Sequence, residues 1–314
     1  MPGGKSWYQI APRQTGQERV RFEPVNTTLP PGQKVACPSV VPGNLSQCAY
    51  VRGTSNATAL ATRSAALIYE NLLRLSRTPN PDMELLDEDY FTVLTKALFV
   101  HSSSWEGQVQ EVMRTLLNID PRREKEELSR FLGYGSSQPD RVMICSDHRV
   151  TLLGWGDIEK DTRHLFNFPM PEEISSIQGQ RTLIATLAWL SPINPRSQRY
   201  RGAQLWFDPK AEENAIETLD LSATGVHGNL IKNGTIQHQI FRGQRAVAIE
   251  HDRLSFHVNC REDGDKVIQP IRYGFAVTLE VDAEIYDPIY TPVRNGVVAL
   301  RQEILEQVRV GERG

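Results

Sequence analysis

The residues best placed to do chemistry are Gly53, Thr54 and Ser55, which stand directly before a stretch of helical character. A serine hydroxyl acts as a nucleophile when it is exposed, when a base lies within reach and when N–H donors stabilise the oxyanion. The first turn of a helix offers free N–H groups and partial positive charge, and a glycine lets the backbone approach a substrate carbonyl. Ser55 is therefore the candidate nucleophile, with its backbone N–H as oxyanion donor, and Gly53 and Thr54 form the turn that a substrate approaches.

The helix that positions Ser55 is predicted over residues 56–75, which contain neither proline nor glycine. Apolar residues recur there at helical spacing, namely Leu60, Leu67, Ile68, Leu72 and Leu75. Ser55 or Thr54 is expected to cap the helix. A capped helix is also the simplest interpretation of Gly-Thr-Ser, so the wider context has to decide between structure and chemistry.

That context resembles the nucleophile region of the subtilisin-like serine peptidases, the subtilases. Residues 31–38 resemble the proline-glycine strand start of the family, and residues 50–68 contain Gly-Thr-Ser-x-Ala and an alanine-rich helix. Later segments resemble the next family helix (94–102), the close of the catalytic domain (133–143) and the first strands of an appended β-sandwich (186–192). The resemblance most suggests a bacterial branch of large intracellular subtilases, some of which are encoded beside an AAA-type ATPase.

The resemblance implies a chain in two parts. Residues 1–146 would be the C-terminal part of a subtilisin-like α/β domain with a doubly wound parallel sheet. Residues 147–314 would be an all-β sandwich, similar to a jelly roll.

The periodicity of the sequence agrees with this order, because helical spacing before residue 146 gives way to alternation of apolar and polar residues. Short strands are predicted at 6–10 and 34–36, further helices at 87–101, 107–117 and through Val142, and a solvated charged helical face at 122–127. Strands are predicted at 150–153, 164–168, 182–189, 204–207, 236–240, 246–249, 254–260 and 273–281, and a closing helix at 297–308.

The residues that subtilases place before the serine have no match in this sequence. The family order is Asp, His, Ser, whereas the first histidine here is His101. No residue before Ser55 matches the family's base, its aspartate motif or the asparagine of its oxyanion hole, and Ala59 stands where the family usually has proline. A serine without its base is a weak nucleophile, so negligible activity is expected of this chain alone.

A histidine downstream of Ser55 is not expected to replace the missing base. The histidines are His101, His148, His164, His227, His238, His251 and His257. Several lie on predicted alternating strands, where a core-edge or outward structural role is the simpler interpretation.

Two functions of different classes remain. In the first, the chain is the nucleophile-bearing part of a serine endopeptidase that acts on polypeptides through an acyl-enzyme. An N-terminal subtilase segment would then supply the Asp, His and Asn, and an AAA-type ATPase is a further partner that the resemblance suggests. In the second, the chain is a non-catalytic binding or adaptor protein derived from a subtilase.

Composition and sequence motifs argue against several other classes of function. The chain has 314 residues and a net charge of -3, which argues against a general nucleic-acid binder. It contains neither a run of 18 apolar residues nor an N-terminal secretory signal, so no membrane association is expected. Scattered cysteines (Cys37, Cys48, Cys145 and Cys260) predict thiols and a cytoplasmic location. No metal or phosphate-loop motif is present, so no metal or cofactor is expected.

Overall fold

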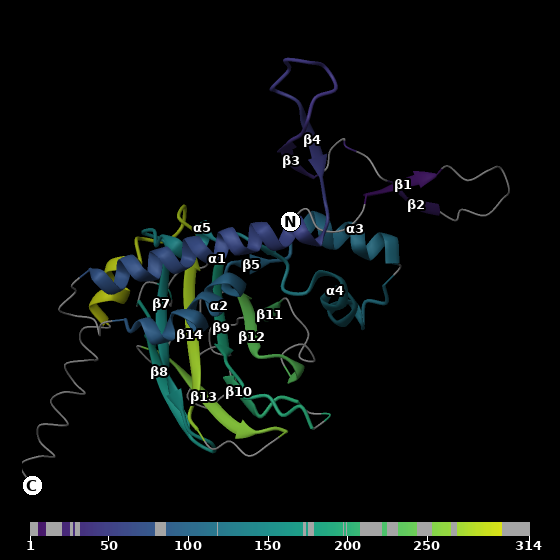
Figure 1. Cartoon of the computed structure of the whole chain (residues 1–314). Helices are drawn as coiled ribbons and strands as arrows, with labels where there is room; N and C mark the ends of the chain where they lie inside the picture. The colour runs from purple at the N-terminus through teal and green to yellow at the C-terminus, as the bar shows by residue number, and fades with distance from the viewer. Residues whose placement is uncertain are drawn as a thin grey trace, which may run out of the picture. The chain divides into compact units, whose positions relative to one another are not determined.

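The chain divides into two compact units in a computed structural model, residues 1–66 and residues 67–314 (Figure 1). The structure describes residues 6–10, 21–25, 28, 32–78, 86–117, 119–171, 174, 179–196, 198, 200–207, 222–224, 232–243, 253–264 and 269–296. Each unit is described by itself.

The first unit contains two antiparallel strand pairs and the start of a long helix. Strand β1 (Ser6–Ile10) pairs with β2 (Arg21–Val25), and β3 (Gln33–Ala36) pairs with β4 (Cys48–Val51). Helix α1 (Thr54–Arg77) follows β4 after two residues. The predicted strands at 6–10 and 34–36 and the predicted helix at 56–75 are thus confirmed.

The second unit contains the rest of α1 and a series of short helices. They are the 3-10 turn η1 (Glu88–Tyr90), α2 (Phe91–His101), α3 (Gly107–Leu117), α4 (Glu124–Leu132) and α5 (Asp140–Met143). Between them β5 (Ser103–Ser104) pairs with β6 (Ser136–Ser137). These helices confirm the predicted ones, and none of the described helices has the length and apolar character needed to cross a lipid bilayer.

The charged residues at 122–127 form the solvated helical face that the sequence predicts. Arg123 pairs with Glu127 at 3.0 Å, and Arg130 pairs with Glu126 at 2.8 Å, both at a spacing of four residues. Both arginines are more than half exposed, so each pair contributes only a few tenths of a kcal/mol.

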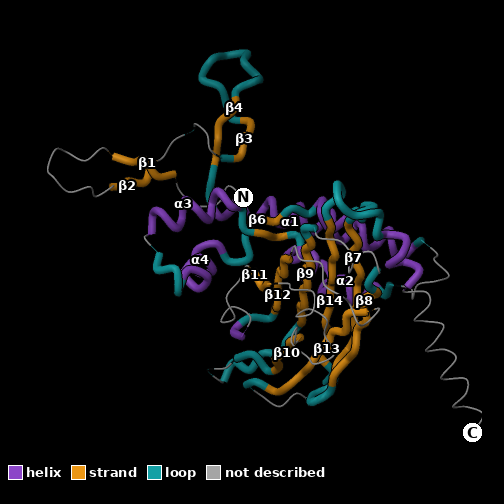
Figure 2. The backbone as a smooth tube through the Cα atoms, turned by 180° about the vertical axis from the view of Figure 1, so that it is seen from behind, coloured by secondary structure: helices purple, strands orange, loops and turns teal. Residues whose placement is uncertain are grey.

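The second unit contains two antiparallel sheets of five and three strands (Figure 2). One has the order β11 (Ser222–Thr224), β12 (Ile236–Gly243), β9 (Arg181–Trp189), β14 (Ile271–Val281) and β7 (Arg149–Ile158). The other has the order β10 (Ala203–Phe207), β13 (Arg253–Glu262) and β8 (Arg163–Pro169). One hydrophobic core joins them, and the rings of Phe207, Phe256 and Phe275 meet there at centroid distances of 5.5 to 6.1 Å. The predicted β-sandwich is therefore present.

Helix α2 covers the outer face of the five-stranded sheet, where it contacts β9 and β14. Along β14 the large residues Tyr273, Phe275, Val277 and Leu279 belong to the sandwich core. The residues that alternate with them point to the opposite face of the sheet, and those that lie under α2 are small. A Cβ added at Gly274 would lie 3.0 Å from the backbone of Val93 and Leu94, so this close approach requires glycine.

The doubly wound parallel sheet that the resemblance implies for residues 1–146 is not found among the described residues. The strand pairs described there are all antiparallel, and β3 and β4 form a hairpin of neighbouring strands. Parallel neighbours would instead need a crossover of a dozen or more residues between them.

The expected division at residue 146 falls inside the second compact unit, because α2 packs on strands β9 and β14. The boundary at residue 146 between a subtilase-like part and an appended sandwich stays a prediction. Strands β2, β4, β5, β6 and β11 were not predicted. The strand predicted at 246–249 and the helix predicted at 297–308 lie outside the described residues.

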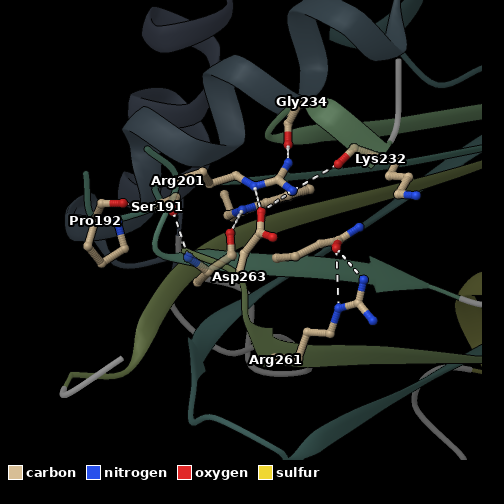
Figure 3. A network of polar contacts seen from close by, with 10 residues as sticks. Ser191, Pro192, Arg201, Lys232, Gly234, Arg261 and Asp263 are labelled. Carbon is tan, nitrogen blue, oxygen red and sulfur yellow. Dashed lines mark hydrogen bonds and ion pairs between the residues drawn. The ribbon is translucent and has the colours of Figure 1, made fainter. Parts of the chain in front are cut away.

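A buried ion pair fixes the loops at one end of the sandwich (Figure 3). The guanidinium of Arg201 contacts the Asp263 carboxylate through Nε at 2.9 Å and Nη2 at 2.5 Å. It also donates to the backbone carbonyls of Gly234 and Lys232. Only 9% of the Arg201 side chain and 17% of the Asp263 side chain are exposed, so each charge depends on the other for compensation.

The Arg201→Ala substitution is expected to lower the free energy of unfolding by about 3–5 kcal/mol, because it leaves a buried carboxylate and two carbonyls without a donor. Urea denaturation followed by tryptophan fluorescence measures this loss. The control is Arg130→Ala, which removes an exposed pair and should cost less than about 1 kcal/mol. Equal losses in the two variants would contradict the role given to Arg201.

Candidate active site

The candidate nucleophile lies where a strand leads into a helix. Strand β4 ends at Val51, and α1 begins at Thr54. Thr54 and Ser55 are both exposed, in the first turn of α1. The first backbone hydrogen bond of the helix runs from the Ala57 N–H to the Gly53 carbonyl at 3.2 Å. The N–H groups of residues 54–56 therefore have no acceptor inside the helix and are free to donate to an anion.

Gly53 occupies the cap position of α1, which corrects the expectation that Thr54 or Ser55 does so. Its φ of +148° is one that residues with a side chain rarely adopt, and its carbonyl is the first acceptor of the helix. Because Thr54 and Ser55 already lie within the helix, neither hydroxyl is needed as a cap. The Ser55 side chain is exposed and makes no hydrogen bond with another described residue.

The first turn of α1 is tied to the hairpin that precedes it. The Asn56 side-chain amide donates to Gln33 Oε1 on β3 at 3.3 Å. The neighbouring hairpin pairs Gln33 with Val51, so β3 contacts both the strand that enters the turn and the helix that leaves it. The turn at Gly53, Thr54 and Ser55 is thus flanked on both sides by residues that contact β3.

The unit that holds Ser55 contains no histidine, because all seven histidines follow residue 100. His227 and His251 lie outside the described residues. His148 contacts the Tyr286 carbonyl at 2.9 Å, and His164 contacts the Tyr273 hydroxyl at 2.7 Å. These two interactions give His148 and His164 structural roles in the second unit.

His101 and His238 belong to a buried chain of polar groups between α2 and the sheet. The two ring nitrogens of His101 lie 2.7 Å from the hydroxyls of Thr186 and Thr278. Thr186 also contacts His238 Nδ1 at 2.7 Å, and Thr278 contacts Thr151 at 2.6 Å. Sequence analysis missed this network, although the polar residues stand at alternate positions of apolar strands.

Burial keeps both histidines neutral. It holds the pKa of His101 well below its ordinary value of 6.5, and the nearby His238 adds to the effect. Burial also lowers the pKa of His238 to about 4. A buried imidazole with a low proton affinity is a poor general base, so these two groups fit a structural role better than a catalytic one.

Lys96 is a half-buried charged residue that the sequence did not single out. Its ammonium donates to the Trp189 carbonyl at 2.9 Å and to the Thr235 hydroxyl at 2.6 Å, and burial lowers its pKa. These contacts tie α2 to the end of β9, which is a structural role.

Metal-ligating side chains and thiols are the remaining reactive groups of the described residues. No group of three or more His, Cys, Asp or Glu side chains is placed there to hold a metal ion. The four cysteines are free thiols, and burial raises the pKa of Cys260 to about 11, which keeps it protonated.

Comparison with known proteins leaves the family open. Neither the protein-family models nor the curated proteins contain a match to this chain. The resemblance to subtilases therefore rests on the sequence alone.

The His238→Asn variant tests whether the buried histidines make stability depend on pH. The unfolded state binds a proton below about pH 6.5, whereas folded His238 binds one only near pH 4. Stability is therefore full above pH 6.5 and falls as the pH approaches 4, by up to about 3 kcal/mol for this residue. Urea denaturation at pH 7.5 and 4.5 should show a smaller difference in the variant than in the unaltered chain. An unchanged pH dependence would contradict this assignment.

Proposed function

We propose that this chain is the nucleophile-bearing part of a subtilisin-like serine peptidase, with Ser55 as the nucleophile. The observation that carries the proposal is the exposed Ser55 hydroxyl in the first turn of a long helix, directly after a positive-φ glycine. This arrangement combines access for a substrate with N–H donors aimed at an oxyanion.

The mechanism that follows is acyl transfer. The Ser55 hydroxyl attacks the scissile carbonyl of a polypeptide, while a histidine removes its proton and passes it to the leaving amine. The backbone N–H of Ser55 donates to the oxyanion, and Gly53 and Thr54 leave the carbonyl room to approach. Water then releases the acyl group and restores the serine hydroxyl.

The proposal requires Asp, His and oxyanion Asn from outside this chain's residues. A serine hydroxyl has no useful fraction of alkoxide at neutral pH, so the base cannot be dispensed with. An N-terminal subtilase segment would supply all three groups. The same resemblance places the complete enzyme in the cytoplasm and suggests an AAA-type ATPase as a further partner.

A second candidate function is a non-catalytic binding or adaptor role. It is favoured by one observation, namely that the unit containing Ser55 has no histidine. In that case the Gly53 turn would only start α1, and the hydroxyl of Ser55 would be dispensable.

Labelling with a fluorophosphonate probe tests the proposal. The purified chain is incubated with the probe, alone and together with an N-terminal subtilase segment that carries Asp and His. Labelling is expected only in the mixture, and Ser55→Ala should reduce it to background. The control is Ser64→Ala, which removes a hydroxyl from the same helix beyond its first turn and should leave labelling unchanged.

Three results would contradict the proposal. Labelling that persists in Ser55→Ala would mean that another residue is the nucleophile. Labelling of the chain alone that disappears in Ser55→Ala would mean that the base lies within this chain. A folded mixture without any labelling would favour the adaptor function.

A further inference from the structure

A polar cavity of about 340 Å³ lies in the second unit, beside the end of α2. Its walls come from the residues that follow α2, from α5 and from the outer face of the five-stranded sheet. The charged residues in the walls are Arg141, Arg149, Arg242 and Glu280. This volume is at the lower end of the range of small-molecule sites.

Three of the four charged residues belong to one row across the sheet. Arg242 on β12 stands opposite Thr182 on β9, and Thr182 stands opposite Glu280 on β14. Glu280 in turn stands opposite Arg149 on β7. Residues directly opposite one another on adjacent strands point to the same face, so the sheet itself sets the spacing of these charges.

The row ends in two cations with little internal compensation. Glu280 is already paired with Arg141 of α5, at 2.5 Å between its Oε2 and Nη2. Arg149 donates from Nη2 to the Ile144 carbonyl, but its Nε is buried without a hydrogen-bond partner among the described residues. Arg242 is exposed and forms no ion pair with another described residue.

The charges of the cavity therefore do not balance. Three arginines and one glutamate leave two positive charges in the walls at neutral pH. An unmatched buried donor such as Arg149 Nε costs free energy in the empty protein, and a bound oxyanion would recover it. The remaining walls include Gln180, which offers a further polar side chain, and Ile184 and Ile240, which offer an apolar surface for the rest of a ligand.

We infer that this cavity binds the dianionic group of a small molecule, either a phosphate monoester or a dicarboxylate. Arg149 and Arg242 hold the oxygens of the dianion from the two ends of the row. Glu280 lies between them in the register, and its negative charge, paired with Arg141 of α5, limits the positive charge. This inference does not depend on Ser55 or on peptidase activity.

Titration calorimetry with the full chain tests the inference. Inorganic phosphate at pH 8 and succinate are the two probes, and sodium chloride of equal ionic strength is the reference. Heat of binding with either probe and none with chloride is expected, and affinity should fall as salt is added. Binding of phosphate alone identifies a phosphate monoester site, and binding of succinate alone identifies a dicarboxylate site. Absence of binding by both probes would overturn the inference.

Charge substitutions make the test specific to this cavity. Arg149→Gln and Arg242→Gln should each weaken binding by about tenfold or more, the effect of losing one charge-assisted hydrogen bond. Glu280→Gln should strengthen it several-fold, because it frees Arg141 and removes the negative charge. The control is Arg130→Gln on α4, which removes a positive charge outside the cavity and should leave affinity unchanged.

The opposite signs of these effects separate binding from damage to the fold, since a damaged variant cannot bind more tightly. Equal affinity of all the folded variants would show that the anion binds elsewhere, and would overturn the inference even if the unaltered chain binds phosphate.

Discussion

The alternation of side chains along β14 is the constraint on which the second unit depends. Its large residues fill the core between the two sheets, and the residues between them face α2. Since neighbouring positions of a strand point to opposite faces, a shift of one residue would put aromatic rings under the helix and glycine into the core. The core between the two sheets and the core between α2 and the five-stranded sheet therefore both depend on β14. This strand is also paired with β7 and β9 along nearly its whole length.

The same face of the sheet changes character along its length. Near Gly274 and Ala276 it is small and apolar, and α2 packs closely on it. At Thr278 it meets His101, the last residue of α2, through a hydrogen bond. One row further on, at Glu280, the helix has ended and the face is polar and charged. The end of α2 thus explains both the buried histidine network and the open cavity beyond it.

Much of this organisation was predicted from the sequence, because its signals are local. The helix through Leu72, the short helices after it and most strands of the sandwich follow from periodicity alone. Strand pairing is a long-range property, so the antiparallel pairing of β3 with β4 could not be read in the same way. The turn at Ser55 was predicted, but its cap was misplaced, since only the backbone shows that Gly53 holds that position. The cavity was missed because Arg242, Glu280 and Arg149 lie on three different strands and are brought into one row only by sheet register.

His101 and His238, which belong to the buried hydroxyl network, are poorly suited to act as the general base of a serine nucleophile. His101 uses both ring nitrogens on threonine hydroxyls, and His238 uses one of its own on Thr186. Burial further lowers the proton affinity of both rings, which weakens them as bases. A general base has to be accessible and has to gain a proton readily during attack, and these rings do neither. His101 and His238 are therefore better suited to a structural role in the second unit than to proton transfer.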